Sequence, residues 1–129
     1  MTIKQRTLTL LPEVFAICRL APDLPIPQWL LQEASFTAIT RTREELSVIC
    51  PQEWVPTDVE LQDRDWRCLK LEGPFELDEP GVMVSMAEPL ATAGLSVFAE
   101  ATYDTDYLLV NDIEVAITTL RQLGHEVVT

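Results

Sequence analysis

The order of strand-like and helix-like segments in the second half of this chain is the feature that most constrains its fold. Two short apolar runs flank the polar turn 103–106, which predicts a hairpin. Helix-like segments lie before and after this hairpin. The predicted elements are, in order, a strand at 66–71, a helix at 80–93, strands at 95–102 and 107–110, a helix at 111–123 and an edge strand at 125–129.

The segment 111–123 is the helix that the sequence specifies best. Asn111 provides an N-cap residue and Glu114 follows three positions later, as in a capping box. Apolar residues recur at the spacing of one helix face, at Ile113, Ala116, Ile117, Leu120 and Leu123. Gly124 ends the helix, because glycine readily adopts the left-handed conformation found at helix ends. We therefore expect an amphipathic helix here.

The helix expected at 80–93 has a less regular sequence. Asp78 or Glu79 can cap it, Pro80 suits its first turn, and Gly94 can take the left-handed position after its end. Pro89 lies inside the segment and lacks the N–H that would bond to the preceding turn, which predicts a kink in the last turn.

The order strand, helix, strand, strand, helix, strand is that of a ferredoxin-like sandwich, in which helices cover one face of the sheet. The first half shows a shorter version, with strands predicted at 15–20, 35–40 and 46–50, a brief helix at 26–32 and a polar connection at 51–65. The segment 39–49 also overlays 101–110, with one extra residue in the turn. We therefore predict an α+β protein of two tandem ferredoxin-like sandwiches packed together, with domains at 1–63 and 64–129.

Composition argues against several kinds of partner. The formal charge of −12 disfavours nucleic acid and anionic membranes, since both attract Lys and Arg. Cys18, Cys50 and Cys68 are odd in number and widely spaced, which indicates free buried thiols rather than disulfides or a zinc site. No apolar run reaches 18 residues, and Pro12 and Glu13 interrupt any signal core. We expect a cytoplasmic protein that binds neither nucleic acid nor membrane.

The sequence also lacks the motifs that would indicate an enzyme. No phosphate-binding loop, dinucleotide fingerprint or zinc-hydrolase motif is present. His125 is the single histidine and follows a helix end, where an imidazole more often contacts the last carbonyls than acts as a base. The acidic turn 103–106 lacks the spacing of a calcium loop. We predict no catalytic residues, no metal and no cofactor.

Two features could bind an amino acid without catalysis. The helix start at Gly81 and Val82 would present free backbone N–H groups to a carboxylate. The acidic turn 103–106 could bind the ammonium group. The alternative interpretation is a solvated hairpin tip in which Asp104 accepts local backbone hydrogen bonds. Both interpretations stay open on the residues alone.

Three segments resemble a known family: SFTAITRTREELSVICPQEWVP, WRCLKLEGP and GVMVSMAEPLATAGLSVFAEATYDTDYLLVNDIEVAITTL. They are similar to the small tandem ACT-domain proteins related to the arginine-sensing CASTOR family and to the regulatory domains of aspartokinases. The resemblance implies a pair of ACT modules with an amino-acid site at their interface. The ligand-contacting residues that it implies are Ser47, Val48, Gly81, Thr102, Tyr103 and Asp106.

Two functions therefore stand as expectations. The first is a non-catalytic regulatory protein that binds an amino acid. In it, the amides of Gly81 and Val82 and the Ser47 hydroxyl hold the ligand carboxylate, while Asp106 with Thr102 and Tyr103 binds the amine. Its partner would be a second copy or a regulated protein. The alternative is a structural module that dimerises through ACT sheets or helices without a ligand.

Overall fold

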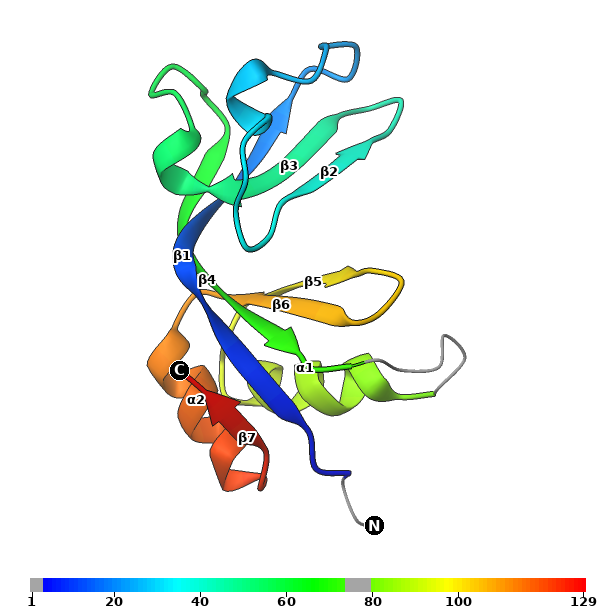
Figure 1. Cartoon of the computed structure of the whole chain (residues 1–129), viewed down its shortest axis with the longest axis vertical. Helices are drawn as coiled ribbons and strands as arrows, with labels where there is room; N and C mark the ends of the chain where they lie inside the picture. The colour runs from blue at the N-terminus through cyan, green and yellow to red at the C-terminus, as the bar shows by residue number, and fades with distance from the viewer. Residues whose placement is uncertain (1–3, 74–79) are drawn as a thin grey trace. The chain divides into compact units, whose positions relative to one another are not determined.

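The computed structural model describes residues 4–73 and 80–129, and in them the chain forms a mixed α/β fold with two α-helices (Figure 1). In chain order the elements are β1 (Thr7–Leu20), the 3-10 helix η1 (Gln28–Leu30), β2 (Ala38–Arg41), β3 (Leu46–Pro51), the 3-10 helix η2 (Gln52–Trp54), β4 (Gln62–Leu71), α1 (Val82–Thr92), β5 (Val97–Ala101), β6 (Asp106–Val110), α2 (Ile113–Gln122) and β7 (Glu126–Val128). The expected caps Asp78 and Glu79 lie outside the described residues. The predicted start of this helix is wrong, because α1 begins at Val82 with Gly81 as its N-cap, and Pro80 precedes the helix instead of lying in its first turn.

The chain packs as two compact units. The helical unit comprises Met1–Leu11 and Arg67–Thr129, and the β unit comprises Pro12–Trp66. The long strands β1 and β4 each continue from one unit into the other. Each unit therefore contains one part of both strands.

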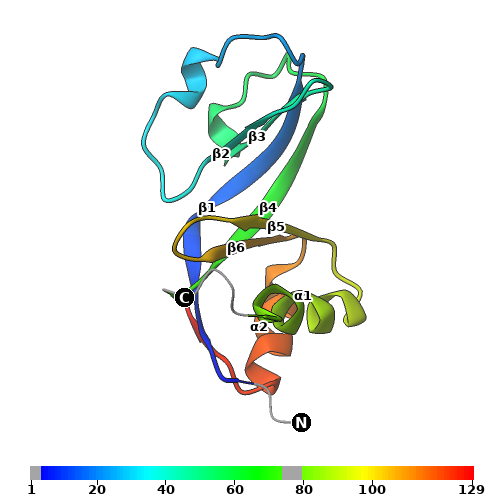
Figure 2. The same cartoon turned by 90° about the vertical axis from the view of Figure 1, so that its right-hand side faces the viewer.

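The helical unit is a sheet with two helices beside it. Its strand order is β7-β1-β4-β6-β5, in which β7 runs parallel to β1, while β4 and β5 both run antiparallel to β6. The helices α1 and α2 contact each other and lie next to this sheet (Figure 2). Met86 and Leu120 from the helices join Leu8, Leu69 and Leu108 from the sheet in one buried cluster. The apolar stripe predicted for α2 therefore faces this core, with Ala116 and Leu120 fully buried.

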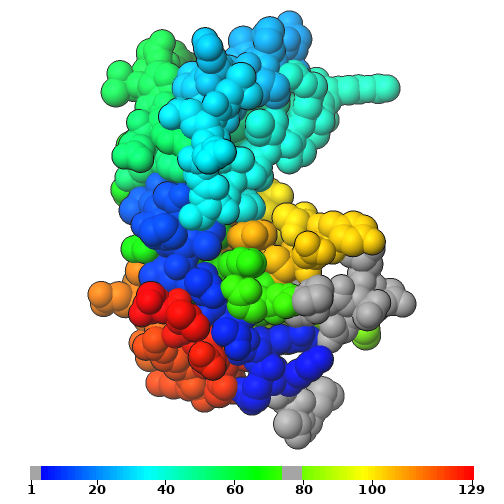
Figure 3. All heavy atoms as spheres, viewed as in Figure 1, coloured from blue at the N-terminus to red at the C-terminus, as the bar shows by residue number. Residues whose placement is uncertain are grey.

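The start of β1 is a strand segment that the sequence analysis missed. The prediction begins at Phe15, whereas β1 begins at Thr7. Pro12 interrupts the apolar pattern and cannot donate to a sheet ladder, but it is exposed and the strand passes through it. Residues 7–9 pair with β7, and the Glu72 amide donates to the Thr7 carbonyl at 2.8 Å. Figure 3 shows β7, in red, against this blue segment.

The β unit has the strand order β2-β3-β1-β4. β3 pairs antiparallel with both β1 and β2, so that Val48 lies opposite Cys18 on one side and Ile39 on the other. At the surface of this unit, Arg41 donates from Nη1 to the carbonyl of Pro22 and from Nη2 to the carbonyl of Leu24. A buried cluster lies beneath the strands and includes Ala16, Cys18, Leu30, Leu46, Val48, Cys50 and Val55.

The helices expected in a full ferredoxin-like sandwich are replaced in this unit by single turns. The helix predicted at 26–32 is the 3-10 turn Gln28–Leu30, and no α-helix occurs within residues 12–66. The predicted connection 51–65 contains a second 3-10 turn, Gln52–Trp54, and the beginning of β4 at Gln62. A helix of one or two turns has little stability in itself, so the apolar contacts of Trp29 and Leu30 with the core decide the local conformation.

The two hairpins have turns of equal length. The Thr42 amide donates to the Glu45 carbonyl at 2.9 Å, and the Thr102 amide donates to the Thr105 carbonyl at 2.8 Å. The sequence overlay, which places Thr40 on Thr102 with one extra residue, is therefore wrong by two positions. Threonine begins both turns, because its hydroxyl accepts backbone N–H groups within the turn.

The helix ends confirm part of the capping prediction. Asp112, not Asn111, is the N-cap of α2, and its carboxylate accepts from the Val115 amide at 3.2 Å. The Asn111 side chain instead accepts from the Ser96 amide at 3.1 Å. Gly94 and Gly124 have the expected positive φ, at 89° and 92°. Pro89 lies inside the last turn of α1, as predicted.

His125 connects the end of α2 to the start of the chain. It is 3% exposed, and its Nδ1 accepts a hydrogen bond from the Arg6 amide at 3.0 Å. Because Nδ1 is the acceptor, the neutral ring carries its proton on Nε2. Burial lowers the pKa of His125 from its ordinary value, and the charge of Arg6 lowers it further. The imidazole is therefore a structural acceptor rather than a base at a cavity.

Stability is expected to fall when the pH drops below about 6.5, because His125 then protonates in the unfolded chain before it does in the folded one. The loss approaches about 1.4 kcal/mol per pH unit at most, and it stops below the folded-state pKa. Urea unfolding at neutral pH and at about pH 5.5 measures it. In His125→Asn, whose amide oxygen can accept from Arg6, this part of the pH dependence should vanish. An unchanged pH dependence in His125→Asn would contradict the assignment.

Candidate functional site

Ser47 and Val48 lie in β3 of the β unit. Ser47 is half-buried and pairs with Arg19 and Thr40 of the flanking strands. The Val48 side chain is fully buried in the core, so its contact with a ligand would have to involve the backbone. Ser47 is therefore the residue of this pair whose side chain can reach a ligand.

Gly81 and Val82 begin α1 in the helical unit. Gly81 is the N-cap and has φ 75°, a left-handed conformation that L side chains rarely adopt. A Cβ placed there would meet nothing within 4 Å, so the backbone conformation, not crowding, requires glycine. The Val82 side chain is buried in the core. The first amides of α1 lack intrahelical partners, and a glycine N-cap offers them no side-chain acceptor.

Gly81 also lines a groove along the two helices. The groove has a volume of about 570 Å³, and its walls come from α1 and the end of α2. Val84, which is exposed, and Leu123 give it an apolar surface, and Glu88 is its charged lining residue. The groove thus extends from the start of α1 along the outer side of the helices.

Thr102, Tyr103 and Asp106 lie at the second hairpin. The Thr102 hydroxyl donates to the Thr105 carbonyl at 2.9 Å and accepts from the Thr105 amide at 3.3 Å, so the turn itself uses it. The Tyr103 side chain is 80% exposed. Asp106 is half-buried, and burial raises the pKa of its carboxyl group. The hydroxyl of Thr102 therefore has a local role, whereas Tyr103 and Asp106 remain available to a ligand.

A polar recess beside this turn contains residues that the sequence analysis missed. It has a volume of about 280 Å³ and is lined by Lys70, Glu72, Gly73, Asp104 and Thr105. Lys70 and Glu72 form an ion pair at 3.5 Å, and the Thr9 hydroxyl donates to Glu72 at 2.8 Å. The recess shares no lining residue with the groove at Gly81.

Thr105 connects the turn to β4. It is buried, and its hydroxyl donates to the Leu71 carbonyl at the end of β4. A buried threonine in a polar hairpin turn has no distinctive sequence pattern, so only the structure reveals this bond. The contact fixes the turn against β4 and positions the neighbouring Asp106.

The described residues contain no group of three or more His, Cys, Asp or Glu side chains that could hold a metal ion. Burial raises the pKa of the Cys18 thiol, and burial together with Cys18 raises the pKa of Cys50 to about 12. Neither thiol is therefore ionised near neutral pH, as a nucleophile would need to be. None of the helices in the described residues is both long and apolar enough to cross a membrane.

Comparison with known proteins identifies two domain models that match this chain. A model of the ACT domain matches residues 62–122, and a model of a distinct N-terminal domain matches residues 13–58. The regulatory subunit of aspartate kinase from Thermus flavus has the same fold, with a TM-score of 0.63 and 14% identity over 96% of this chain and 99% of that one. No curated protein matches the sequence. Residues 62–122 therefore match the ACT domain, and the chain shares its fold with this regulatory subunit.

Two further solved structures are similar. Protein Atu0741 from Agobacterium tumefaciens is 38% identical, with a TM-score of 0.89 over 98% of this chain and 94% of that one. Protein VC0802 from Vibrio cholerae, described as a possible transport protein, is 22% identical, with a TM-score of 0.68 over 93% and 88% of the two chains. The 38% identity to Atu0741 extends over nearly the whole of both chains, so this chain belongs to the same family as Atu0741.

Proposed function

We propose that this chain is a non-catalytic regulatory protein that binds an amino acid through its ACT domain. The match over residues 62–122 carries this proposal, because the start of α1 at Gly81 and the hairpin at 102–106 lie within it. Similarity in fold to regulatory subunits of aspartate kinase supports the regulatory role.

The proposed ligand contacts follow from the chemistry of an amino acid. Its carboxylate accepts from the amides of Gly81 and Val82, which the glycine N-cap leaves without a side-chain acceptor. Its ammonium group donates to Asp106, next to the exposed Tyr103. Ser47 and Val48 of the β unit are further proposed ligand contacts, and Ser47 contributes through its hydroxyl.

The strand order of the β unit supports a tandem arrangement. Its elements follow the order strand, turn, strand, strand, turn, strand, and the sheet order β2-β3-β1-β4 places the first and third of these strands in the middle. A ferredoxin-like sandwich has this arrangement with helices in place of the turns. We therefore interpret the β unit as a reduced ACT-like half that is related to the CASTOR and aspartokinase modules. The buried free thiols of Cys18, Cys50 and Cys68 agree with a cytoplasmic location.

At least one of the twenty amino acids is expected to raise the melting temperature of the ligand-free protein. A ligand that binds only the folded state at a hundredfold excess over its Kd adds about 2.7 kcal/mol of stability. Asp106→Ala should abolish this shift and still fold, because burial raises the pKa of Asp106 and its negative charge is therefore not expected to stabilise the folded state at neutral pH. Differential scanning fluorimetry measures both effects.

Asp104→Ala is the matched control, since Asp104 lies in the same turn and is exposed. It should retain the ligand shift. A flat screen on protein that has been unfolded and refolded to remove bound metabolites would contradict the proposal, as would an undiminished shift in Asp106→Ala.

One observation favours the second candidate, an interaction module without a ligand. β5 is at the end of the strand order, and in the described residues it pairs only with β6. Phe98 in this strand is 45% exposed. An unpaired edge with an exposed aromatic residue can pair with another chain. Measurement of molecular mass with and without amino acids separates the two candidates, because this module would form an oligomer that metabolites do not change.

A further inference from the structure

The helical unit has an apolar groove on its surface, of which the proposed amino-acid site uses only the residues at the start of α1. The groove has a volume of about 570 Å³, with Gly81, Ser85, Pro89 and Thr92 along its α1 side and Thr119 and Leu123 along its α2 side. The four α1 residues recur every three or four positions and so form one stripe of the helix. Because α1 has 11 residues and is therefore about 16 Å long, the groove has room for about three turns of another helix.

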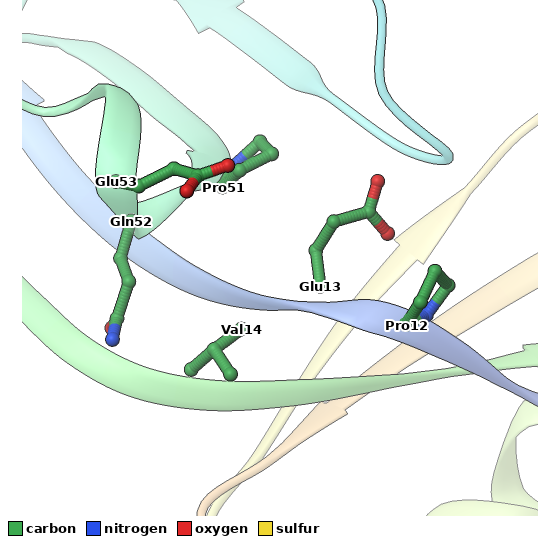
Figure 4. Close-up of a pocket in the computed structure, with 6 residues that line it drawn as sticks. All are labelled: Pro12, Glu13, Val14, Pro51, Gln52 and Glu53. Carbon is green, nitrogen blue, oxygen red and sulfur yellow. The ribbon is translucent and has the colours of Figure 1, made fainter.

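The hollow in the β unit, between β1 and the end of β3, has a different character (Figure 4). Its Glu13 carboxylate has one oxygen bonded to the Ser35 amide at 2.8 Å and the other oxygen buried. The Gln52 side chain is bonded in both directions to Asp65, at 3.1 and 2.7 Å. These polar groups serve the unit's own chain and are not available to a ligand. The groove in the helical unit is the larger and more apolar of the two.

The chain along this groove carries very little charge. From Pro80 to Val97 the single charged side chain is Glu88, although 23% of the whole sequence is charged. Val84 lines the groove and is 59% exposed. A surface helix usually presents charged side chains on the face that points away from the core. The outer face of α1 therefore has the composition of a surface that another apolar surface covers.

The hydroxyl groups in the groove are bonded within their own helices. Ser85 donates to the Val82 carbonyl at 2.7 Å, and Thr119 donates to the Val115 carbonyl at 2.8 Å. Neither hydroxyl needs a donor or an acceptor from a partner. Apolar side chains can therefore cover them without leaving a donor unsatisfied.

The polar groups that remain in the groove are acceptors. Glu88 is exposed, and no lining residue in the described part of the chain is basic. Pro89 has no N–H, so the Ser85 carbonyl lacks the donor that it would have in an uninterrupted helix. Acidic side chains also clearly outnumber basic ones in the sequence of this unit. The groove is therefore complementary to a partner that is apolar and positively charged.

This charge distribution decides between the possible occupants. A second copy would bring its own Glu88 and the same excess of acidic residues to the interface, and like charges repel. A basic amphipathic helix meets the groove on both counts. Its apolar face can cover Val84 and Leu123, and a lysine or arginine beside that face can donate to Glu88.

We propose that the groove along α1 and the end of α2 docks an amphipathic helix of a partner protein, apolar on one face and with lysine or arginine beside it. The apolar contacts supply the affinity, and Glu88 selects basic partners over acidic ones. This docking surface goes beyond the proposed amino-acid site, since Asp106 does not line the groove.

The test uses the full chain and a synthetic helical peptide with leucines on one face and lysines on the other. Its counterparts have glutamate in place of each lysine, or the same composition in scrambled order. NMR titration at constant ionic strength should show saturable amide shifts over residues 84–92 and 119–123 with the lysine peptide. The glutamate and scrambled peptides should give none.

Three variants test the contacts. Glu88→Lys should weaken binding of the lysine peptide at least about tenfold. Glu126→Lys is the matched control, because it makes the same charge change at an exposed glutamate of β7 outside the groove, and it should weaken binding less than about threefold. Val84→Ser removes an exposed apolar side chain and should weaken binding at least about fivefold.

Several results would overturn the proposal. These are equal affinities in Glu88→Lys and Glu126→Lys, equal binding of the scrambled peptide, or no saturable shift at about 1 mM peptide. A dimer of the free protein that dissociates in Val84→Ser would also overturn it, because a second copy would then cover the groove. Asp106→Ala separates this surface from the proposed function. It should leave peptide binding unchanged even if the amino-acid screen is flat, and a loss of peptide binding in this variant would count against a separate surface.

Discussion

Residues 64–129, produced without the rest of the chain, are expected not to fold as a monomer. This fragment lacks residues 7–11, which lie between β7 and β4 in the helical unit. Leu8 in this segment is fully buried in the main core cluster and lies opposite Val127. Without it, β7 loses the strand with which it pairs, and the core of a very small domain opens to solvent. Near-ultraviolet circular dichroism and amide dispersion by NMR measure the outcome.

Adding the missing strand provides the control. A synthetic peptide of residues 4–16, or the same segment fused through a flexible linker, should restore dispersed amide signals to the 64–129 fragment. The domain boundary between residues 63 and 64 remains a prediction that this cut tests. Cooperative unfolding by the fragment alone would show that residues 7–11 are dispensable and that the boundary separates independent domains.

Phe15→Ala is expected to lower the free energy of unfolding by about 3–5 kcal/mol, the usual cost of removing a fully buried aromatic side chain. The ring is fully buried, and it packs edge-to-face on Phe36 with centroids 6.0 Å apart and an interplanar angle of 75°. Because Phe15 lies in the middle of β1 opposite Pro51, the surrounding strands cannot close the cavity easily. Urea unfolding of the variant and the parent protein gives the difference.

Two variants separate loss of packing from loss of aromatic character. Phe15→Leu retains most of the apolar volume and should cost less than half as much as Phe15→Ala. Tyr103→Ala removes an aromatic ring that is largely exposed and should change stability by less than about 0.5 kcal/mol. A cost below about 1 kcal/mol for Phe15→Ala would show that this part of the β unit repacks freely.

In the second half of the chain, the structure agrees closely with the prediction from the sequence, because the sequence signals there are local. The stripe of α2, the glycines after both helices and the second hairpin depend on neighbouring residues, and the structure has all of them. In the first half the agreement is poorer, because the 3-10 helix η1 forms where the sequence predicts a longer helix. The start of β1 was missed for a related reason. Its partners are residues 126–128 and β4, and no local pattern around Pro12 indicates pairing with segments so far along the chain.

The candidate site also contains some features that the sequence predicts and others that only the structure reveals. The turn at Thr102 could be predicted, since threonine has a defined role in turns. The left-handed N-cap conformation of Gly81 was not predicted, because the sequence favoured Pro80 in the first turn of the helix and Asp78 or Glu79 as its cap. The contact between Thr105 and Leu71 could not be predicted, because it joins residues that are distant in sequence.

The pairing of residues 7–9 with 126–128 has a consequence for synthesis on the ribosome. Arg6 and His125, which are hydrogen-bonded, lie 119 positions apart, nearly the whole length of the chain. A strand made early must therefore wait until residues 126–128 have left the exit tunnel before the helical unit is complete. Contacts of such long range slow folding and leave apolar strand edges exposed in the meantime. Nascent chains of this protein are expected to be a substrate for the chaperones that shield unpaired strands until residues 126–128 emerge.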